Sequence, residues 1–122
     1  MELIPKKDLI RRQKDKDIVH KTALQVIKDF SQFGYDIQFP EDLYMAYNEL
    51  FDQLTETVKM LLNENAQKLF SLLYTIDISE SSVQRGLREM KDLPVHDALT
   101  HLILERELKK VLTREYFSKG NS

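Results

Sequence analysis

Apolar side chains recur at three- and four-residue spacing along most of the chain, which places them on one face of an α-helix. The first such stretch predicts a helix over residues 17–33. Gly34 follows at once, in the position where a left-handed residue closes a helix. Residues 6–16 offer only Leu9 and Ile10 for burial, so they either extend this helix or are disordered. The apolar positions of the predicted helix are Ile18, Val19, Ala23, Val26, Ile27, Phe30 and Phe33.

A second, longer apolar stripe begins after Pro40, a residue that suits the first turn of a helix. Glu41 and Asp42 then supply the negative charge that the start of a helix favours. Residues 63–65 are a plausible break, because Asn tolerates a left-handed cap, yet the stripe continues in phase beyond them. Two helices and one bent helix of about 35 residues are both open. The stripe comprises Leu43, Tyr47, Leu50, Phe51, Leu54, Val58, Leu61 and Leu62, then Ala66, Leu69, Leu72, Leu73 and Ile76.

Residues 69–74 are apolar on nearly every side, which predicts deep burial. After a short turn, Ser79 or Ser81 caps the next helix, and Ser81 with Gln84 has capping-box spacing. This helix is expected to end near Met90, with Val83, Leu87 and Met90 facing inward. A last helix is expected from Val95 to Phe117. Its inward stripe is Val95, Leu99, Leu102, Ile103, Val111 and Leu112, with Tyr116 or Phe117 at the end, and Glu105 pairs with Lys109.

No stretch of the sequence predicts a sheet, so the expected fold is all-α: a compact bundle of four to five helices with short connections. The length of 122 residues suits a single domain spanning residues 1–122. Residues 1–16 and 118–122 are expected to be frayed. No apolar run is long enough to cross a membrane, and no apolar signal stretch follows the basic start. We therefore expect a cytoplasmic protein.

Charge is distributed unevenly along the chain, although the formal net charge is only −2. Residues 1–21 carry seven basic and four acidic groups, and residues 83–122 carry eight basic and six acidic groups. The middle, residues 22–82, carries three basic and ten acidic groups. This balance excludes a globally basic nucleic-acid binder. The absence of cysteine excludes disulfides, Cys-ligated metals and a thiol nucleophile.

The most specific local pattern lies in residues 69–90, which combine a buried helix, a tight turn and a Ser-rich helix start. This pattern resembles the helix-turn-helix of bacterial DNA-binding domains. The resemblance implies that Val83 and Leu87 pack inward. It also implies that the polar face of the second helix meets DNA, where Arg forks onto guanine and Gln onto adenine. The DNA-facing residues would be Ser81, Ser82, Gln84, Arg85 and Arg88.

The same segment departs from the helix-turn-helix pattern in three places. Asp77 stands where the turn usually carries Gly, and the bulky Leu73 stands where a small residue lets the helices cross closely. Gly86 lies inside the second helix, at a cost of about 1 kcal/mol relative to Ala. The acidic middle of the chain would also repel phosphate. An ordinary corner of a helical bundle, a geometry that any all-α protein uses, is the favoured explanation of the pattern.

Catalytic and metal-binding motifs are absent from the sequence. Asp97, His101 and Glu105 lie at four-residue steps, but their line continues into Lys109 as a solvated helix face would. No nucleophile elbow, Walker loop or dinucleotide fingerprint occurs. We therefore predict a non-enzymatic protein with no catalytic residues, no cofactor and no metal site.

Aromatic side chains are more numerous than a small bundle needs to expose, and Tyr is favoured at interfaces because it buries a ring and keeps a wet end. They are Tyr35, Phe39, Tyr44, Tyr47, Tyr74, Tyr116 and Phe117. This favours a protein-interaction or assembly module that binds a protein partner or forms a homo-oligomer. The alternative is a DNA-binding regulator that uses residues 81–88, and only this alternative predicts a nucleic-acid partner.

Residues 72–79 and 103–110 are similar to short helical proteins of bacteria whose function is unknown. The resemblance implies a bacterial cytoplasmic helical protein and brings no activity or site residues.

Overall fold

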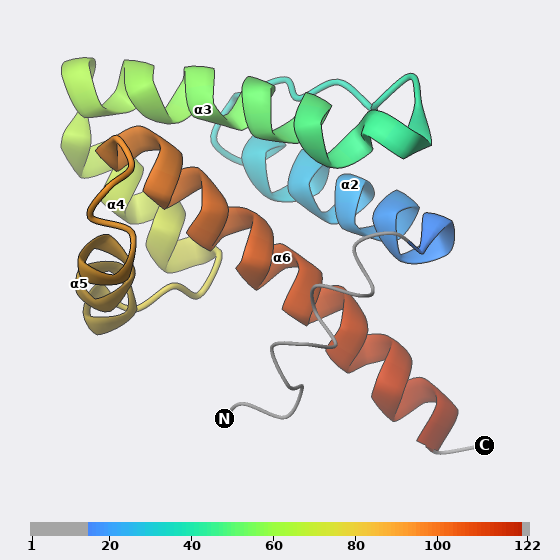
Figure 1. Cartoon of the computed structure of the whole chain (residues 1–122). Coiled ribbons are helices and arrows are strands. Elements are labelled where there is room, and N and C mark those ends of the chain that lie inside the picture. Colours follow the sequence, from blue (N-terminus) through green and yellow to red (C-terminus); the bar gives the residue numbers. More distant parts are fainter. Residues whose placement is uncertain (1–14, 121–122) are drawn as a thin grey trace.

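A computed structural model describes residues 15–120, with side chains to Phe117. Five α-helices and one short 3-10 helix make up this part of the chain, which contains no strand, so the all-α prediction is confirmed (Figure 1). Of the residues predicted to be frayed, 1–14 and 121–122 lie outside the described range. The prediction is wrong for the others, because Asp15 caps α2, Lys16 is its first residue, and residues 118–120 have helical backbone. The elements are α2 (Lys16–Ser31), η1 (Leu43–Met45), α3 (Ala46–Glu64), α4 (Ala66–Thr75), α5 (Glu80–Glu89) and α6 (Val95–Gly120).

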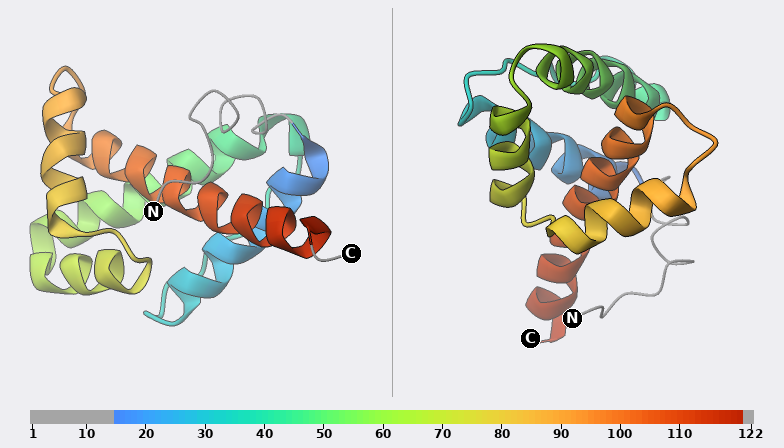
Figure 2. Two further views of the ribbon diagram at one scale, coloured as in Figure 1. Left: turned by 90° about the horizontal axis from the view of Figure 1, so that it is seen from below. Right: turned by 90° about the vertical axis from the view of Figure 1, so that its left-hand side faces the viewer.

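Helix α6 is the centre of the bundle. It packs against α2, α3 and α5, while α4 packs mainly against α3. Figure 1 shows α6 running diagonally under α3 and past α2, with its last turns reaching beyond the other helices. Figure 2 shows α5 running across α4 and not alongside it. One long helix therefore holds together elements that are distant in sequence.

Both ends of helix α2 are capped by residues close to them in the sequence. The side chain of Asp15 accepts hydrogen bonds from the backbone N–H groups of Asp17 and Ile18 at 3.1 and 3.4 Å. At the other end Gly34 is left-handed (φ 85°), and the N–H of Tyr35 returns to the carbonyl of Phe30 at 3.1 Å. The predicted role of Gly34 is confirmed.

Asn65 divides the long stripe into two helices, which settles the alternative left open by the sequence. Its backbone is extended (φ −159°), so the expected left-handed cap is wrong. Instead its side chain accepts a hydrogen bond from the N–H of Lys68 at 3.1 Å and starts α4. Asn65 is thus the N-cap of the second helix.

The main core lies where α2, α3, α4 and α6 meet, and its largest fully buried side chain is Phe30. A smaller cluster joins Ile18 of α2 to Leu108, Val111 and Leu112 of α6. The remaining main-core residues come from every element except η1. They are Ala23, Val26, Ile37, Leu50, Leu54, Val58, Leu61, Leu69, Leu72, Leu73, Ile76, Ile78, Val83, Leu99, Ile103 and Leu104.

Some sequence predictions about burial are wrong. Ala66, placed in the long apolar stripe, is exposed at the start of α4. Residues 69–74 are not buried on every side, because Phe70 and Tyr74 are 58% and 83% exposed on the outer face of α4. On α6, Val95, Tyr116 and Phe117 are exposed. The physical reason is that, among residues 15–120, α4 packs mainly against α3 on its inner side, and the ends of α6 are not covered by the other described helices.

The buried face of α6 also contains residues outside the predicted stripe. These are Ala98, Thr100, Leu104, Glu107 and Leu108. The stripe is wider than a single apolar line because α6 packs against neighbours on more than one side. It includes a carboxyl group, which simple apolar periodicity passes over.

Candidate functional site

The turn between α4 and α5 has the left-handed residue expected of a helix-turn-helix, although that residue is Asp and not Gly. Asp77 is left-handed (φ 73°), the conformation for which this position of a helix-turn-helix usually carries glycine. The N–H of Ile78 bonds to the carbonyl of Leu73 at 2.9 Å. The Asp77 carboxylate accepts a hydrogen bond from Arg106 of α6 at 2.8 Å. An Asp therefore forms the turn, which is tied to α6.

Helix α5 starts at Ser79. The Ser79 hydroxyl accepts a hydrogen bond from the N–H of Ser82 at 3.1 Å, so Ser79 is the N-cap. The alternative capping box of Ser81 with Gln84 is wrong, because both residues lie inside the helix with exposed side chains. The helix ends at Glu89, one residue before the predicted end.

The outer face of α5 is polar and accessible. Ser81, Gln84, Arg85 and Arg88 are exposed, and Ser82 is half-buried. Among the described residues no ion pair engages Arg85 or Arg88, so both guanidinium groups are available to a partner. The structure thus brings four of the five predicted DNA-facing residues to one open surface.

The inner face of α5 packs on α6 through a glycine. Gly86 is buried, and a Cβ added to it would lie 2.7 Å from both terminal methyl carbons of Leu102. Val83 is buried in the main core and the half-buried Leu87 packs against it, so the inward packing predicted for both residues is confirmed. Leu73 is buried at the corner, and α5 packs mainly against α6. This arrangement differs from a close crossing of the two corner helices.

A cluster of charged side chains lies between α2 and α6 and is largely buried. Glu107 is fully buried at 0% exposure, and Asp29 is buried at 7%. Lys110 Nζ lies 3.1 Å from Asp29 Oδ2 and 3.0 Å from Glu107 Oε1. Gln25 Nε2 donates to Asp29 Oδ1 at 3.0 Å. One lysine and one amide therefore face two carboxyl groups.

The two carboxyl groups hold their protons unequally. Burial, together with the hydrogen bond to Asp29, raises the pKa of Glu107 to about 8. Burial also pushes the pKa of Asp29 upward, but hydrogen bonds with Glu107 and Lys110 outweigh it and leave that pKa lowered. Neither Glu107 oxygen receives a well-aligned hydrogen bond from a described residue. With a pKa of about 8, Glu107 is mostly protonated at neutral pH, whereas Asp29 carries the negative charge that faces Lys110.

The histidine of α6 that lies nearest the core is held by aromatic side chains of α3. Tyr47 Oη lies 3.2 Å from His101 Nδ1, and the His101 ring lies 4.7 Å from that of Phe51. Burial, and then the charge of Glu105, raises the pKa of Tyr47. The phenol and imidazole thus form a packed pair at the edge of the core.

The two carboxylates one turn before and after His101 on α6 contact other side chains. Asp97 lies 3.4 Å from His96, and Glu105 lies 3.3 Å from Lys109, as its spacing predicted. Within residues 15–120, no group of three or more His, Cys, Asp or Glu side chains is arranged to hold a metal ion.

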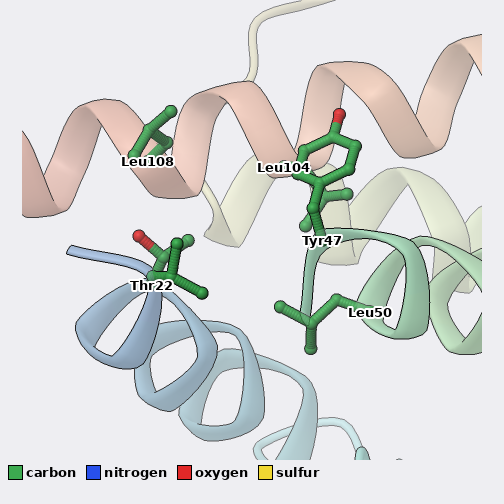
Figure 3. A pocket seen from close by; sticks show the side chains of 6 residues that line it. Thr22, Tyr47, Leu50, Leu104 and Leu108 are labelled. Atoms are coloured by element: carbon green, nitrogen blue, oxygen red, sulfur yellow. The ribbon is translucent and has the colours of Figure 1, made fainter. Parts of the chain in front are cut away.

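A small apolar recess opens between α2, α3 and α6 (Figure 3). Its volume of about 20 Å³ is room for about one water molecule. It is lined by Val19, Thr22, Tyr47, Leu50, Leu104 and Leu108. A recess of this size and lining cannot hold a substrate.

Exposed aromatic residues gather on two surfaces. The first, which we call the η1 surface, consists of His20, Leu24, Phe39, Tyr44 and Met45, all exposed. The second, which we call the α4 face, consists of Phe70 and Tyr74, one helical turn apart. The remaining exposed pair, Tyr116 and Phe117, lies near the end of α6 with ring centroids 5.6 Å apart.

No protein-family model, curated protein or solved structure matches this chain. Among the described residues no helix is both long enough and apolar enough to cross a membrane.

Proposed function

We propose that the chain is a small non-enzymatic helical interaction module, which acts by binding another protein or a second copy of itself. The observation that carries the proposal is the exposure of large apolar side chains beside a well-packed core. Tyr44 is 82% exposed on the η1 surface, and Tyr74 is 83% exposed on the α4 face. Fully burying a large apolar side chain stabilises by about 1.5–3 kcal/mol, so a partner that covers these rings gains binding energy.

Paired serine substitutions on each surface test the proposal. Phe39→Ser with Tyr44→Ser alters the η1 surface, and Phe70→Ser with Tyr74→Ser alters the α4 face. We expect at least one pair to reduce association while circular dichroism shows an unchanged helical fold. Association is measured by sedimentation velocity over a range of concentrations and by crosslinking mass spectrometry in the producing cells. If neither pair changes the mass in solution or the crosslinked neighbours, the proposal is wrong.

A DNA-binding regulator is the second candidate, and a specific observation favours it. The turn at Asp77 is left-handed, and Arg85 and Arg88 are exposed without an ion pair among the described residues. The exposed Glu80 and Glu89 at the two ends of α5 argue against it, because they place negative charge on the same helix as the arginines.

Fluorescence anisotropy with labelled genomic fragments, at low and near-physiological salt, tests the second candidate. A DNA-binding protein would show affinity that falls steeply with salt. The double variant Arg85→Glu with Arg88→Glu would abolish that binding and leave the fold intact. Lack of binding at tens of micromolar protein in low salt would exclude this candidate.

A further inference from the structure

The η1 surface is built on a connection that is fixed to the rest of the protein. Ile37 and Pro40 are buried, so the two anchors flank the exposed Phe39. The N–H of Gln38 donates to Gln53 Oε1 at 2.8 Å, and Gln53 Nε2 donates back to the carbonyl of Gln38 at 3.0 Å. This double hydrogen bond joins the connection to α3. Because the connection is already ordered, a partner that binds here would lose little binding free energy to ordering this surface.

The side chains of the η1 surface form one continuous area. The Phe39 ring packs edge-on against His20 of α2, with centroids 4.9 Å apart. Leu24 follows His20 by about one helical turn, and Lys16 precedes it by the same step. Lys16 Nζ lies 4.3 Å from the centroid of the Tyr44 ring. Residues from α2 and from the 35–45 connection thus share one face.

Exposed acidic side chains lie next to the residues of this apolar area in the sequence. Asp36, Glu41 and Asp42 of the connection are exposed, and Asp17 is exposed on α2. Of the three nearby lysines, Lys21 pairs with Asp17 and Glu115, Lys16 lies over a ring, and Lys28 is exposed one turn beyond Leu24. Over residues 15–28 and 35–45, which contribute this surface, the chain carries five acidic and three basic side chains. The surface is therefore apolar at its centre and negative at its rim.

This charge pattern selects the kind of partner. A second copy that presented the same face would bring two negative rims together, which is unfavourable. A segment with apolar side chains between lysines or arginines would match both the centre and the rim. We infer that the η1 surface binds a basic amphipathic segment of another protein, an inference that rests on the proposed interaction function.

The probe for this inference is a fluorescein-labelled peptide of 20 residues with Leu on one helical face and Lys elsewhere. A second peptide with Glu in place of Lys is the control for apolar binding without charge complementarity. Anisotropy is measured with the full chain at near-physiological salt. We expect the Lys peptide to bind at least tenfold more tightly than the Glu peptide.

Charge reversal locates the binding. Glu41→Lys with Asp36→Lys alters the rim and should raise the dissociation constant of the Lys peptide at least tenfold. Glu56→Lys with Glu64→Lys makes the same change of charge on exposed positions of α3, ten or more residues after its first residue, Ala46, and should raise it less than threefold. Equal weakening by the two pairs would mean unspecific attraction and would overturn the inference.

Serine substitution separates this inference from the proposed function. The double variant Phe39→Ser with Tyr44→Ser should raise the dissociation constant of the Lys peptide at least tenfold. If this pair instead removes self-association, and the Lys peptide does not bind, the occupant is a second copy, so the inference is wrong and the interaction function stands. If the pair changes neither peptide binding nor association, the η1 surface is not an interaction site.

Discussion

The two halves of α6 hold the protein together in different ways. Residues 95–104 bury apolar side chains, chiefly Leu99, Ile103 and Leu104, against the rest of the main core. Residues 105–117 face α2 with a smaller apolar cluster, formed by Leu108, Val111 and Leu112 against Ile18, and also with charged groups. Among these are the buried Glu107 and the lysine that pairs with Asp29. Apolar packing tolerates small shifts, whereas ion pairs and shared protons require a defined geometry. The first half therefore contributes mainly stability, and the second half mainly the position of α2 along α6.

The largest expected effect is a cavity in the apolar half. Ile103→Ala removes a side chain that is fully buried, and we expect a loss of about 2–5 kcal/mol in the free energy of unfolding. Urea denaturation should show the same loss at pH 5 and at pH 8, because no titrating group is removed. Tyr116→Ala, at an exposed position of the same helix, is the control and should change stability by less than about 0.5 kcal/mol.

The next effect removes the cation from the charged half. Lys110→Ala leaves Asp29 buried without its ion-pair partner, and we expect destabilisation of about 1–3 kcal/mol at pH 7. The control is Lys59→Ala, which removes an exposed lysine of α3 and should cost less than about 0.5 kcal/mol. Equal effects of the two substitutions, measured by urea denaturation, would show that the buried contact adds nothing.

The pH dependence of stability comes from the same half. The pKa of Glu107 is raised from an ordinary value of 4.5 to about 8, so its contribution to stability is present below pH 4.5 and is lost as the pH rises toward 8. Glu107→Gln keeps a donor for Asp29 without this titration. We expect the variant and the native protein to be about equally stable at pH 5.

At pH 9 the variant Glu107→Gln should be more stable than the native protein by about 1–3 kcal/mol. Thermal denaturation followed by circular dichroism at pH 5, 7 and 9 measures the difference. Glu115→Gln, on the same helix, should show no such crossing with pH. Parallel stability curves for native protein and Glu107→Gln would mean that Glu107 is ionised in the folded state.

Most of the helices could be predicted from local signals. The bounds of α2 and α5 follow from Asp15, Gly34 and Ser79, whose roles depend on neighbours within a few residues. The break at Asn65 was predicted only as an alternative. A hydrophobic stripe in phase on both sides of it gave no indication of where the helix ends.

The buried cluster of Asp29, Glu107 and Lys110 could not be predicted from periodicity, because Asp29 lies on another helix, 81 residues from Lys110. A signal nevertheless existed, since Glu107 lies four residues from both Ile103 and Val111 and continues their line. A charged residue in an apolar stripe is usually taken as solvent-exposed, and only the facing helix shows that it is buried. The exposure of Phe70 and Tyr74 depends likewise on the lack of a neighbour outside α4 among the described residues.

The smallest effect tests how closely α5 must approach the apolar half of α6. Gly86→Ala should gain about 1 kcal/mol of helix propensity but forces the Leu102 methyl groups to move, because the added Cβ would lie 2.7 Å from them. Since overpacking typically costs about 1–3 kcal/mol, we expect a net loss of about 1 kcal/mol in urea denaturation. Combining Gly86→Ala with Leu102→Ala removes the clash, so the Gly86→Ala step should become stabilising in that background. A Gly86→Ala step that is equally unfavourable in both backgrounds would place the constraint in the backbone of α5 and not in its contact with α6.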